Sequence, residues 1–181
     1  MGPVGSGKTS AIRTISDIEV VDTDALATDG VAKMKSHTTV SMDVGTLVLG
    51  EKDKLRLYGT PGQDRFDFMW DILLDQSKGV LLLINHSAEE PLADLAHYLD
   101  ALEKRRGNRV VPLVVCISHM DKAPERPFEL YQDFFKSQRQ MAVEDMPPVI
   151  AVDARSQADV RSALVAMTAL LEMHERFPKH A

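Results

Sequence analysis

Three apolar runs, each about the length of one strand, lie in the middle and the second half of the chain. They cover residues 79–85, 110–118 and 147–152. Runs of this length with few polar residues are typical of strands that are buried on both faces of a sheet. Residues 40–49 instead alternate between apolar and polar side chains, and a Gly-Glu-Lys-Asp turn follows at 50–53. Together with the strand-like segment 54–58, this alternation predicts an antiparallel β-hairpin.

Segments with a helical pattern separate these strands. They cover residues 9–15, 66–76, 91–105, 128–140 and 157–175. The last of them repeats apolar residues at helical spacing from Val160 to Leu171. Alternating strands and helices predict an α/β fold with a mostly parallel sheet and one antiparallel edge hairpin. Residues 17–38 show no sustained period and are predicted to form a long polar loop, which in a compact domain is usually functional.

Composition narrows the class of protein. The chain has 181 residues, of which 44% are hydrophobic and 27% charged, so we expect one globular domain over residues 1–181. The net charge of −6 argues against a nucleic-acid partner. The single cysteine, Cys116, lies in an apolar run, which predicts a buried thiol and fits a reducing cytoplasm. No apolar stretch approaches the roughly 18 residues of a membrane helix, so we expect no intrinsic membrane anchor.

The first nine residues carry the strongest chemical signal. Residues 2–9 read GPVGSGKT and fit the phosphate-binding pattern G-x-x-x-x-G-K-[ST]. In such a P-loop the backbone N–H groups surround a triphosphate, Lys8 reaches the β- and γ-phosphates, and the Thr9 hydroxyl binds Mg²⁺. A helix that begins near Lys8 directs its positive end toward the same anion. The motif predicts nucleotide binding with Mg²⁺.

A P-loop normally connects a buried central strand to a helix, but only Met1 precedes Gly2 here. The first central strand is therefore missing from the given sequence. Two explanations remain: the sequence begins after that strand, or the fold dispenses with it. We favour the first, because an absent central strand would leave two unpaired edges inside the sheet.

A second motif follows the predicted hairpin. Residues 59–66 read GTPGQDRF. In a P-loop protein, the Gly62 amide at this place can bond a γ-phosphate oxygen, and the Gln63 side chain can orient the attacking water. The alternative is a Pro-Gly turn that only joins a strand to a helix. The aromatic residues that follow, from Phe66 to Trp70, either pack this helix on the sheet or form a partner surface that changes with the nucleotide.

The P-loop, the long polar loop, the hairpin and the Pro-Gly-Gln segment together resemble a Ras-like small GTPase. More narrowly, residues 38–45 (TTVSMDVG) and 58–66 (YGTPGQDRF) are similar to a bacterial branch found with Roadblock-type proteins and related to the gliding-motility switch. The resemblance implies a three-layer P-loop NTPase fold, GTP and GDP as ligands, and a Roadblock/longin-like regulatory partner. It also implies that Thr39 binds Mg²⁺ and senses the γ-phosphate, with Thr38 as the alternative.

The sequence departs from that family at the magnesium site. Small GTPases of this kind carry aspartate where Gly59 stands, and the aspartate holds a magnesium-bound water. The resemblance therefore implies weakened Mg²⁺ binding here and a tightening when aspartate replaces Gly59. Asp22 or Asp24 could substitute, although acidic residues in such a loop are more often solvated. Residues 17–39 contain no arginine, which implies slow hydrolysis without a partner.

It departs at the base-binding motifs as well. The family's Asn-Lys-x-Asp reads Ser-His-Met-Asp at 118–121. Asp121 can still accept two hydrogen bonds from guanine that adenine cannot supply, whereas Ser118 and His119 lack the amide contacts and the aliphatic stacking. The family's Ser-Ala-Lys loop corresponds to Asp-Ala-Arg at 153–155.

We therefore predict a guanine-nucleotide switch with slow, Mg²⁺-dependent GTP hydrolysis. The alternatives are a non-hydrolysing nucleotide-binding module and a P-loop small-molecule kinase. A kinase needs an arginine-rich lid, whereas the arginines here cluster at Arg105, Arg106 and Arg109, on a predicted loop between helix and strand. The predicted catalytic residue is Gln63, and the predicted metal ligands are Thr9 and Thr39. The predicted nucleotide-binding residues are Gly2, Val4, Gly5, Ser6, Gly7, Lys8, Thr9, Ser10, Thr39, Gly62, His119, Asp121, Asp153, Ala154 and Arg155.

Overall fold

The computed structural model describes residues 1–22, 42–51, 53–62, 68–107 and 109–177. The strands are β1 (Val21–Asp22), β2 (Asp43–Val48), β3 (Lys54–Gly59), β4 (Val80–Asn85), β5 (Leu113–Ser118) and β6 (Val149–Ala151). The α-helices are α1 (Lys8–Ile15), α2 (Phe68–Gln76), α3 (Pro91–Arg106), α4 (Leu130–Asp133) and α5 (Gln157–Arg176). Short 3₁₀ turns cover Met120–Lys122 and Val143–Asp145, and a π-helical segment, Phe134–Gln138, extends α4.

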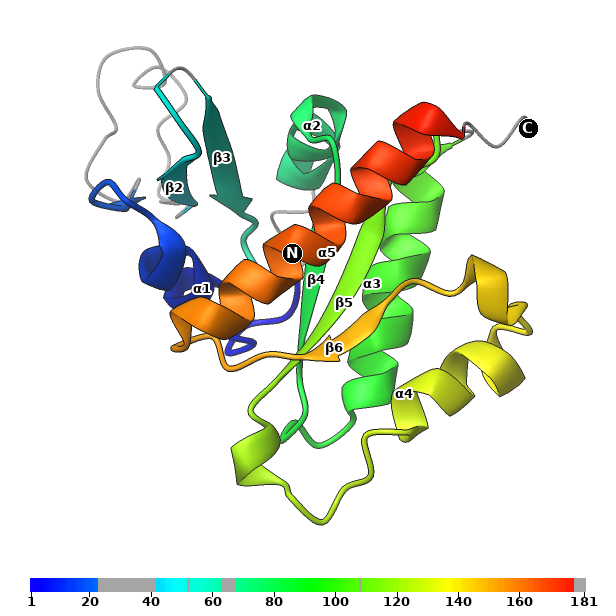
Figure 1. Ribbon diagram of the computed structural model, residues 1–181. Coiled ribbons are helices and arrows are strands. Elements are labelled where there is room, and N and C mark those ends of the chain that lie inside the picture. Colours follow the sequence, from blue (N-terminus) through cyan, green and yellow to red (C-terminus); the bar gives the residue numbers. More distant parts are fainter. Residues whose placement is uncertain (23–41, 52, 63–67, 108, 178–181) are drawn as a thin grey trace.

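The described strands form two three-stranded sheets (Figure 1). In one, β2 and β3 form the predicted antiparallel hairpin, in which Asp43 lies opposite Gly59 and Val48 opposite Lys54. In the other, β4, β5 and β6 are parallel. The prediction of a mostly parallel sheet with an antiparallel hairpin is thus confirmed for the strands themselves. Within the described ranges β3 and β4 are not hydrogen-bonded neighbours, so the hairpin and the parallel strands form separate sheets.

The predicted polar loop is interrupted by a strand. The backbone of β1 pairs antiparallel with β2 at Val44 and Asp43, so residues 21 and 22 are not loop. Two residues carry no periodicity of their own, and they become a strand because the outer edge of β2 offers hydrogen-bonding groups. The predicted loop residues from 23 to 38, including Asp24, lie outside the described ranges.

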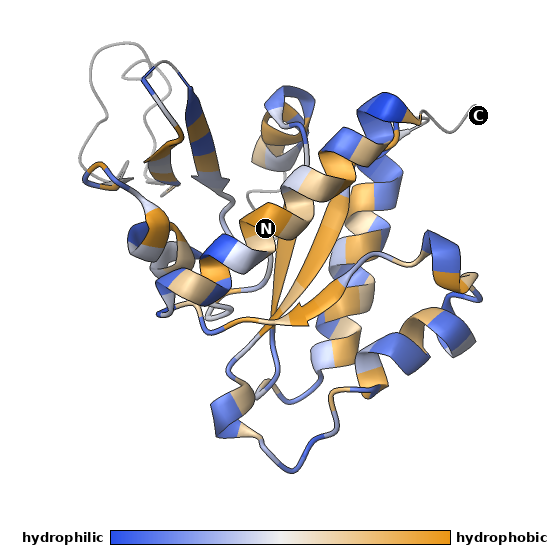
Figure 2. Cartoon of the chain, in the orientation of Figure 1, coloured by the Kyte–Doolittle hydropathy of each residue, from blue (hydrophilic) through white to orange (hydrophobic). Residues whose placement is uncertain are grey.

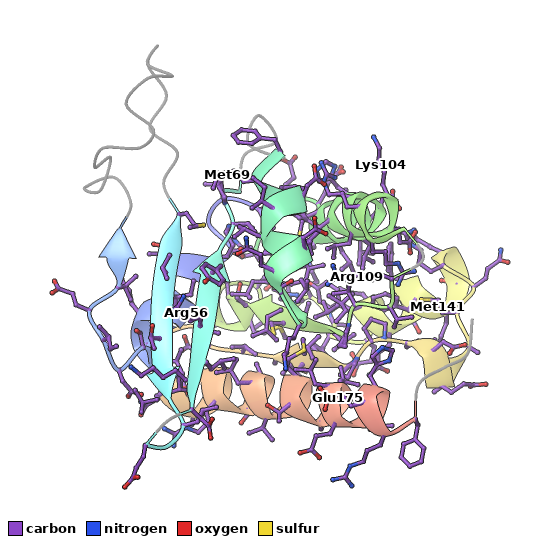
Figure 3. The ribbon with its side chains drawn as sticks, turned by 90° about the horizontal axis from the view of Figure 1, so that it is seen from above. Arg56, Met69, Lys104, Arg109, Met141 and Glu175 are labelled. Carbon is purple, nitrogen blue, oxygen red and sulfur yellow. The ribbon has the colours of Figure 1, made fainter. Side chains whose placement is uncertain are left out.

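Two hydrophobic clusters lie on opposite faces of the parallel sheet. Leu82 and Ile84 of β4 pack into the cluster with α2 and α3, whereas Leu83 packs into the cluster with α1 and α5. This alternation follows the two-residue period of a strand. Figure 2 shows β4 and β5 as hydrophobic, and Figure 3 shows α5 on one side of them and α2 and α3 on the other. Cys116, on β5, is a buried free thiol, as predicted.

The predicted helices are present with two corrections. The helix predicted at 128–140 begins at Leu130 and widens into a π-helical segment where the adjacent Phe134 and Phe135 are both buried. Arg105 and Arg106 lie in α3, because their segment continues the helical pattern, and not in the expected loop. None of the helices within the described ranges is both long enough and apolar enough to span a membrane.

Two arginines, one at the end of α3 and one just after it, form ion pairs with α2. Arg105 pairs with Asp71 at 3.1 Å, and its guanidinium lies 5.1 Å from the centre of the Trp70 ring. Arg109 pairs with Asp75 at 3.4 Å. Trp70 is 1% exposed, which confirms the packing interpretation for this side chain.

Candidate functional site

The P-loop has the backbone that its glycines predict. Gly5 and Gly7 have φ values of 76° and 93°, in the left-handed region that glycine adopts without strain. A Cβ atom on Gly2 would lie 2.1 Å from the Leu83 carbonyl oxygen, so the loop starts in close contact with β4. The Asn85 side-chain amide donates to the Gly5 carbonyl at 3.5 Å. The loop is therefore held at the carboxyl end of β4, where parallel sheets bind ligands.

The phosphate side of this loop presents donors. Lys8 Nζ donates to the carbonyl oxygens of Gly2 and Pro3, both at 2.7 Å. Burial lowers the pKa of Lys8 to about 8, and the nearby Asp43 carboxylate opposes that shift. The Ser6 hydroxyl is buried with no hydrogen-bond partner among the described residues. Because α1 begins at Lys8 with neither a side-chain cap nor an acidic residue in its first turn, its N–H groups remain available to an anion.

A carboxylate that was not among the predicted site residues lies beside Thr9. The Thr9 hydroxyl donates to Asp43 Oδ2 at 2.5 Å. A Cβ atom on Gly59 would lie 3.1 Å from Asp43 Cβ and 3.2 Å from Asp43 Oδ2. The Asp43 carboxylate, reaching across from β2, thus lies in the space beside Gly59. Thr9 and Asp43 offer a hydroxyl and a carboxylate oxygen, which are the ligand types that Mg²⁺ prefers.

The second motif lies directly against the P-loop. A Cβ atom on Gly62 would lie 2.6 Å from the Val4 nitrogen and 3.0 Å from Lys8 Nζ. Tyr98 donates its hydroxyl to the Gly62 carbonyl, and Trp70 donates its indole N–H to the Pro61 carbonyl, each at 3.2 Å. These two bonds hold the segment in place. The predicted residues Gln63, Thr38 and Thr39 lie outside the described residues.

Ser118 makes a contact that the sequence analysis did not foresee. Its hydroxyl donates to the Ser6 carbonyl at 2.8 Å, and the Ile84 carbonyl oxygen lies 3.2 Å from the same hydroxyl oxygen. A side chain shorter than asparagine therefore still fastens the end of β5 to the P-loop. Next along the chain, His119 adopts a left-handed φ of 58°. Its ring lies beside Gly7, 3.8 Å from where a Cβ atom would stand.

The loop between β6 and α5, which contains the predicted Asp153, Ala154 and Arg155, also lies against the P-loop. A Cβ atom on Gly7 would lie 3.0 Å from Ala154 Cβ, so this loop also touches the P-loop. Arg155 donates to both carboxylate oxygens of Asp153 at 2.9 Å, and these bonds lower the pKa of Asp153 to about 2. The same guanidinium reaches Asp121 Oδ2 at 3.4 Å. Three loops thus converge, with Asp121 half-exposed at the rim.

Comparison with known proteins identifies the family. Residues 16–179 match the family described as "Conserved hypothetical ATP binding protein". The chain belongs to this family. The matched range includes the loops after β5 and β6 and the hairpin with Asp43, whereas the P-loop precedes it.

The chain is also similar to small GTPase-like proteins. It is 27% identical over 92 residues to ADP-ribosylation factor-related protein 1 from Homo sapiens, and 26% identical to that protein from Bos taurus. Each match covers 51% of this chain and 45% of the relative, so the chain spans about half the length of these curated relatives. At the family level, the chain is a nucleotide-binding, small GTPase-like P-loop protein.

Nucleotide binding by this family member is expected to take up about half a proton at pH 8. Lys8 is half-protonated there before binding, and triphosphate oxygens favour its charged form, so its pKa rises. Calorimetry of nucleotide binding in two buffers of different ionisation enthalpy measures the uptake. The Lys8→Arg variant is the control, because arginine stays charged; equal uptake in both proteins would contradict the assignment.

Proposed function

We propose that this chain is a guanine-nucleotide-dependent molecular switch that hydrolyses GTP slowly with Mg²⁺. The observation that carries the proposal is the position of Asp121. The loop that bears it is fastened to the P-loop by the hydrogen bond from Ser118 to Ser6, and its carboxylate stands at the rim of the site. A carboxylate there accepts hydrogen bonds from the N1–H and 2-amino groups of guanine, whereas adenine has an acceptor at N1.

The phosphate end supports the same proposal. The P-loop amides and Lys8 bind the phosphate chain, and the Gly62 amide contacts the terminal phosphate. Thr9 and Asp43 would hold Mg²⁺ through a hydroxyl and a carboxylate oxygen. Bound Mg²⁺ neutralises charge on the phosphate oxygens. Gln63 orients water. Thr39 senses the terminal phosphate, so the first switch loop responds to that phosphate.

Slow hydrolysis follows from the arginine positions. Residues 17–39 contain none, and Arg155 stands at the base side, paired with Asp153 and Asp121. A partner would therefore accelerate turnover by supplying a cation or by fixing Gln63. We propose a Roadblock/longin-like regulatory protein for that role. Phe68 and Ile72 on α2, which are 54% and 57% exposed, offer it an apolar contact next to the second motif.

The ion pairs of α3 argue against the kinase alternative. A small-molecule kinase closes an arginine-bearing lid over its phosphates. Here Arg105 and Arg109 instead pair with Asp71 and Asp75, two carboxylates of α2. Moving Arg105 and Arg109 toward bound phosphates would break these two ion pairs.

The Asp121→Asn variant is expected to weaken GTP binding about 10- to 100-fold and to reduce discrimination against ATP. The amide replaces one acceptor by a donor, so one guanine hydrogen bond is lost. Competition between labelled GTP and unlabelled ATP, measured at fixed Mg²⁺, tests this.

Glu125→Gln is the matched control, because it removes a charge from an exposed residue of the same connecting segment. If the parent protein binds GTP and ATP equally, or prefers ATP as the description of its family suggests, Asp121 does not select guanine and the proposal fails.

A further inference from the structure

The loop between β6 and α5 holds an arginine in a fixed orientation beside Asp121. Arg155 donates from Nε and from Nη2 to the two carboxylate oxygens of Asp153, each at 2.9 Å. A planar guanidinium bound through two parallel hydrogen bonds is fixed in both position and direction. The backbone N–H of Arg155 also donates to Asp153 Oδ1 at 2.9 Å, so one carboxylate holds both the side chain and the loop.

The bonds to Asp153 use only one side of the guanidinium. Its Nη1 and Nη2 groups form a second fork of N–H donors at the far end of the side chain. Nη2 lies 3.4 Å from Asp121 Oδ2, which is longer than the 2.9 Å bonds to Asp153. Within the described part of the chain, Nη1 has no hydrogen-bond partner. The second fork can therefore donate to a ligand that lies beside Asp121.

The residues that replace the asparagine and lysine of Asn-Lys-x-Asp direct their nearest polar groups elsewhere. The Ser118 hydroxyl has one hydrogen, which it donates to the Ser6 carbonyl. In the 2.9 Å contact between Ser118 Oγ and His119 Nδ1, the histidine is therefore the donor. A guanine bound at Asp121 would receive no hydrogen bond at O6 or N7 from the Ser118 hydroxyl or from His119 Nδ1.

Guanine has two acceptors that match the second fork of Arg155. O6 and N7 lie on one edge of the base, and arginine bound to both is the commonest specific contact to guanine in protein–DNA complexes. Because O6 is carried by the ring atom next to N1, a guanine whose N1–H donates to Asp121 has O6 near that carboxylate, where Nη2 lies. Adenine has an amino group in place of O6 and would bring a donor toward the guanidinium.

We propose that Arg155 is a second specificity-determining residue for guanine, which donates from Nη1 and Nη2 to O6 and N7 while Asp121 accepts from N1–H and the 2-amino group. This inference rests on the proposed function, because it requires guanine to bind at Asp121. Asp153 is a positioning residue, since it fixes the fork without touching the base. The guanidinium thus supplies donors that Ser118 does not.

The test compares GTP with two analogues that each lose one contact. 7-Deaza-GTP has a C–H group in place of N7, and inosine triphosphate lacks the 2-amino group that Asp121 would bind. Each analogue is expected to bind the parent protein about 10-fold more weakly than GTP. In Arg155→Met, the difference between GTP and 7-deaza-GTP is expected to disappear, whereas the difference between GTP and inosine triphosphate remains. Competition against labelled GTP at fixed Mg²⁺ measures these dissociation constants.

Three further variants separate the fork from charge and from folding. Arg161→Met removes the same charge from an exposed position of α5 and is expected to keep both differences. Arg155→Lys keeps the charge but has no fork, so it is expected to behave like Arg155→Met. Asp153→Asn is expected to reduce the 7-deaza difference alone. Full rescue by lysine would reduce the role of Arg155 to its charge and would overturn the contact to O6 and N7.

The remaining outcomes distinguish this inference from the proposed function. If Arg155→Met keeps the 7-deaza difference, Arg155 does not contact N7. If Arg155→Met binds GTP more tightly than the parent, Arg155 competes with the base for Asp121. With a parent that prefers GTP to ATP, either result overturns the role of Arg155 and leaves the proposed function standing. A parent without that preference overturns both.

Discussion

Replacing Asp43 by asparagine is expected to weaken Mg²⁺ binding about 10- to 100-fold while the protein stays folded. The carboxylate accepts the hydrogen bond of the Thr9 hydroxyl and lies beside Gly59. The small GTPases that this chain resembles carry aspartate at the position of Gly59. Asparagine has nearly the same shape and keeps one oxygen, so the hairpin is not disturbed. It loses the negative charge that a hard divalent cation requires.

A magnesium titration followed by release of a fluorescent nucleotide measures this effect. Asp53→Asn is the matched control, because it removes an exposed carboxylate from the turn of the same hairpin. An unchanged magnesium midpoint in the Asp43 variant, or an equal shift in the control, would exclude Asp43 from the metal site.

The structure also changes the expectation for Gly59→Asp. A side chain at Gly59 would press against Asp43, since even its Cβ atom would lie 3.2 Å from Asp43 Oδ2. The single variant therefore brings two carboxylates together and is expected to weaken magnesium binding instead of tightening it. The exchange of positions, Asp43→Gly with Gly59→Asp, is expected to recover most of the affinity.

The sequence places Asp43 near Gly59 only to within one residue. Counting back from the predicted turn at 50–53 pairs residue 49 with residue 54 and so puts Asp43 opposite Thr60, whereas the structure pairs Val48 with Lys54 and Asp43 with Gly59. A carboxylate opposite a glycine on a neighbouring strand can reach the space that the glycine leaves. Comparison of single positions with a family gives no sign of such a contact across strands.

Other features had no signal in the sequence. The apolar runs predicted β4 and β5 because burial on both faces leaves a continuous pattern. Whether the Ser118 hydroxyl reaches Ser6 depends instead on how closely β5 approaches the P-loop, which is a property of the packed structure.

Replacing Gln63 by leucine is expected to leave triphosphate binding near normal and to lower single-turnover GTP hydrolysis by about 100-fold or more. The residues before it are held at the P-loop, since Pro61 and Gly62 accept hydrogen bonds from Trp70 and Tyr98. Residue 63 therefore follows directly on a segment anchored beside Lys8. Leucine keeps the bulk of glutamine but cannot orient water, so the loss falls on the chemical step.

Gln132→Leu is the control for this assay, because it makes the same replacement at an exposed position of α4. A Gln63 variant as fast as the parent would remove Gln63 from the mechanism. A parent that binds GTP and Mg²⁺ yet shows no single-turnover hydrolysis would favour the non-hydrolysing module, with Thr9 and Asp43 serving only to hold the ligand. Because Asp43 and Gln63 act on different steps, the two variants together separate loss of the metal from loss of the chemistry.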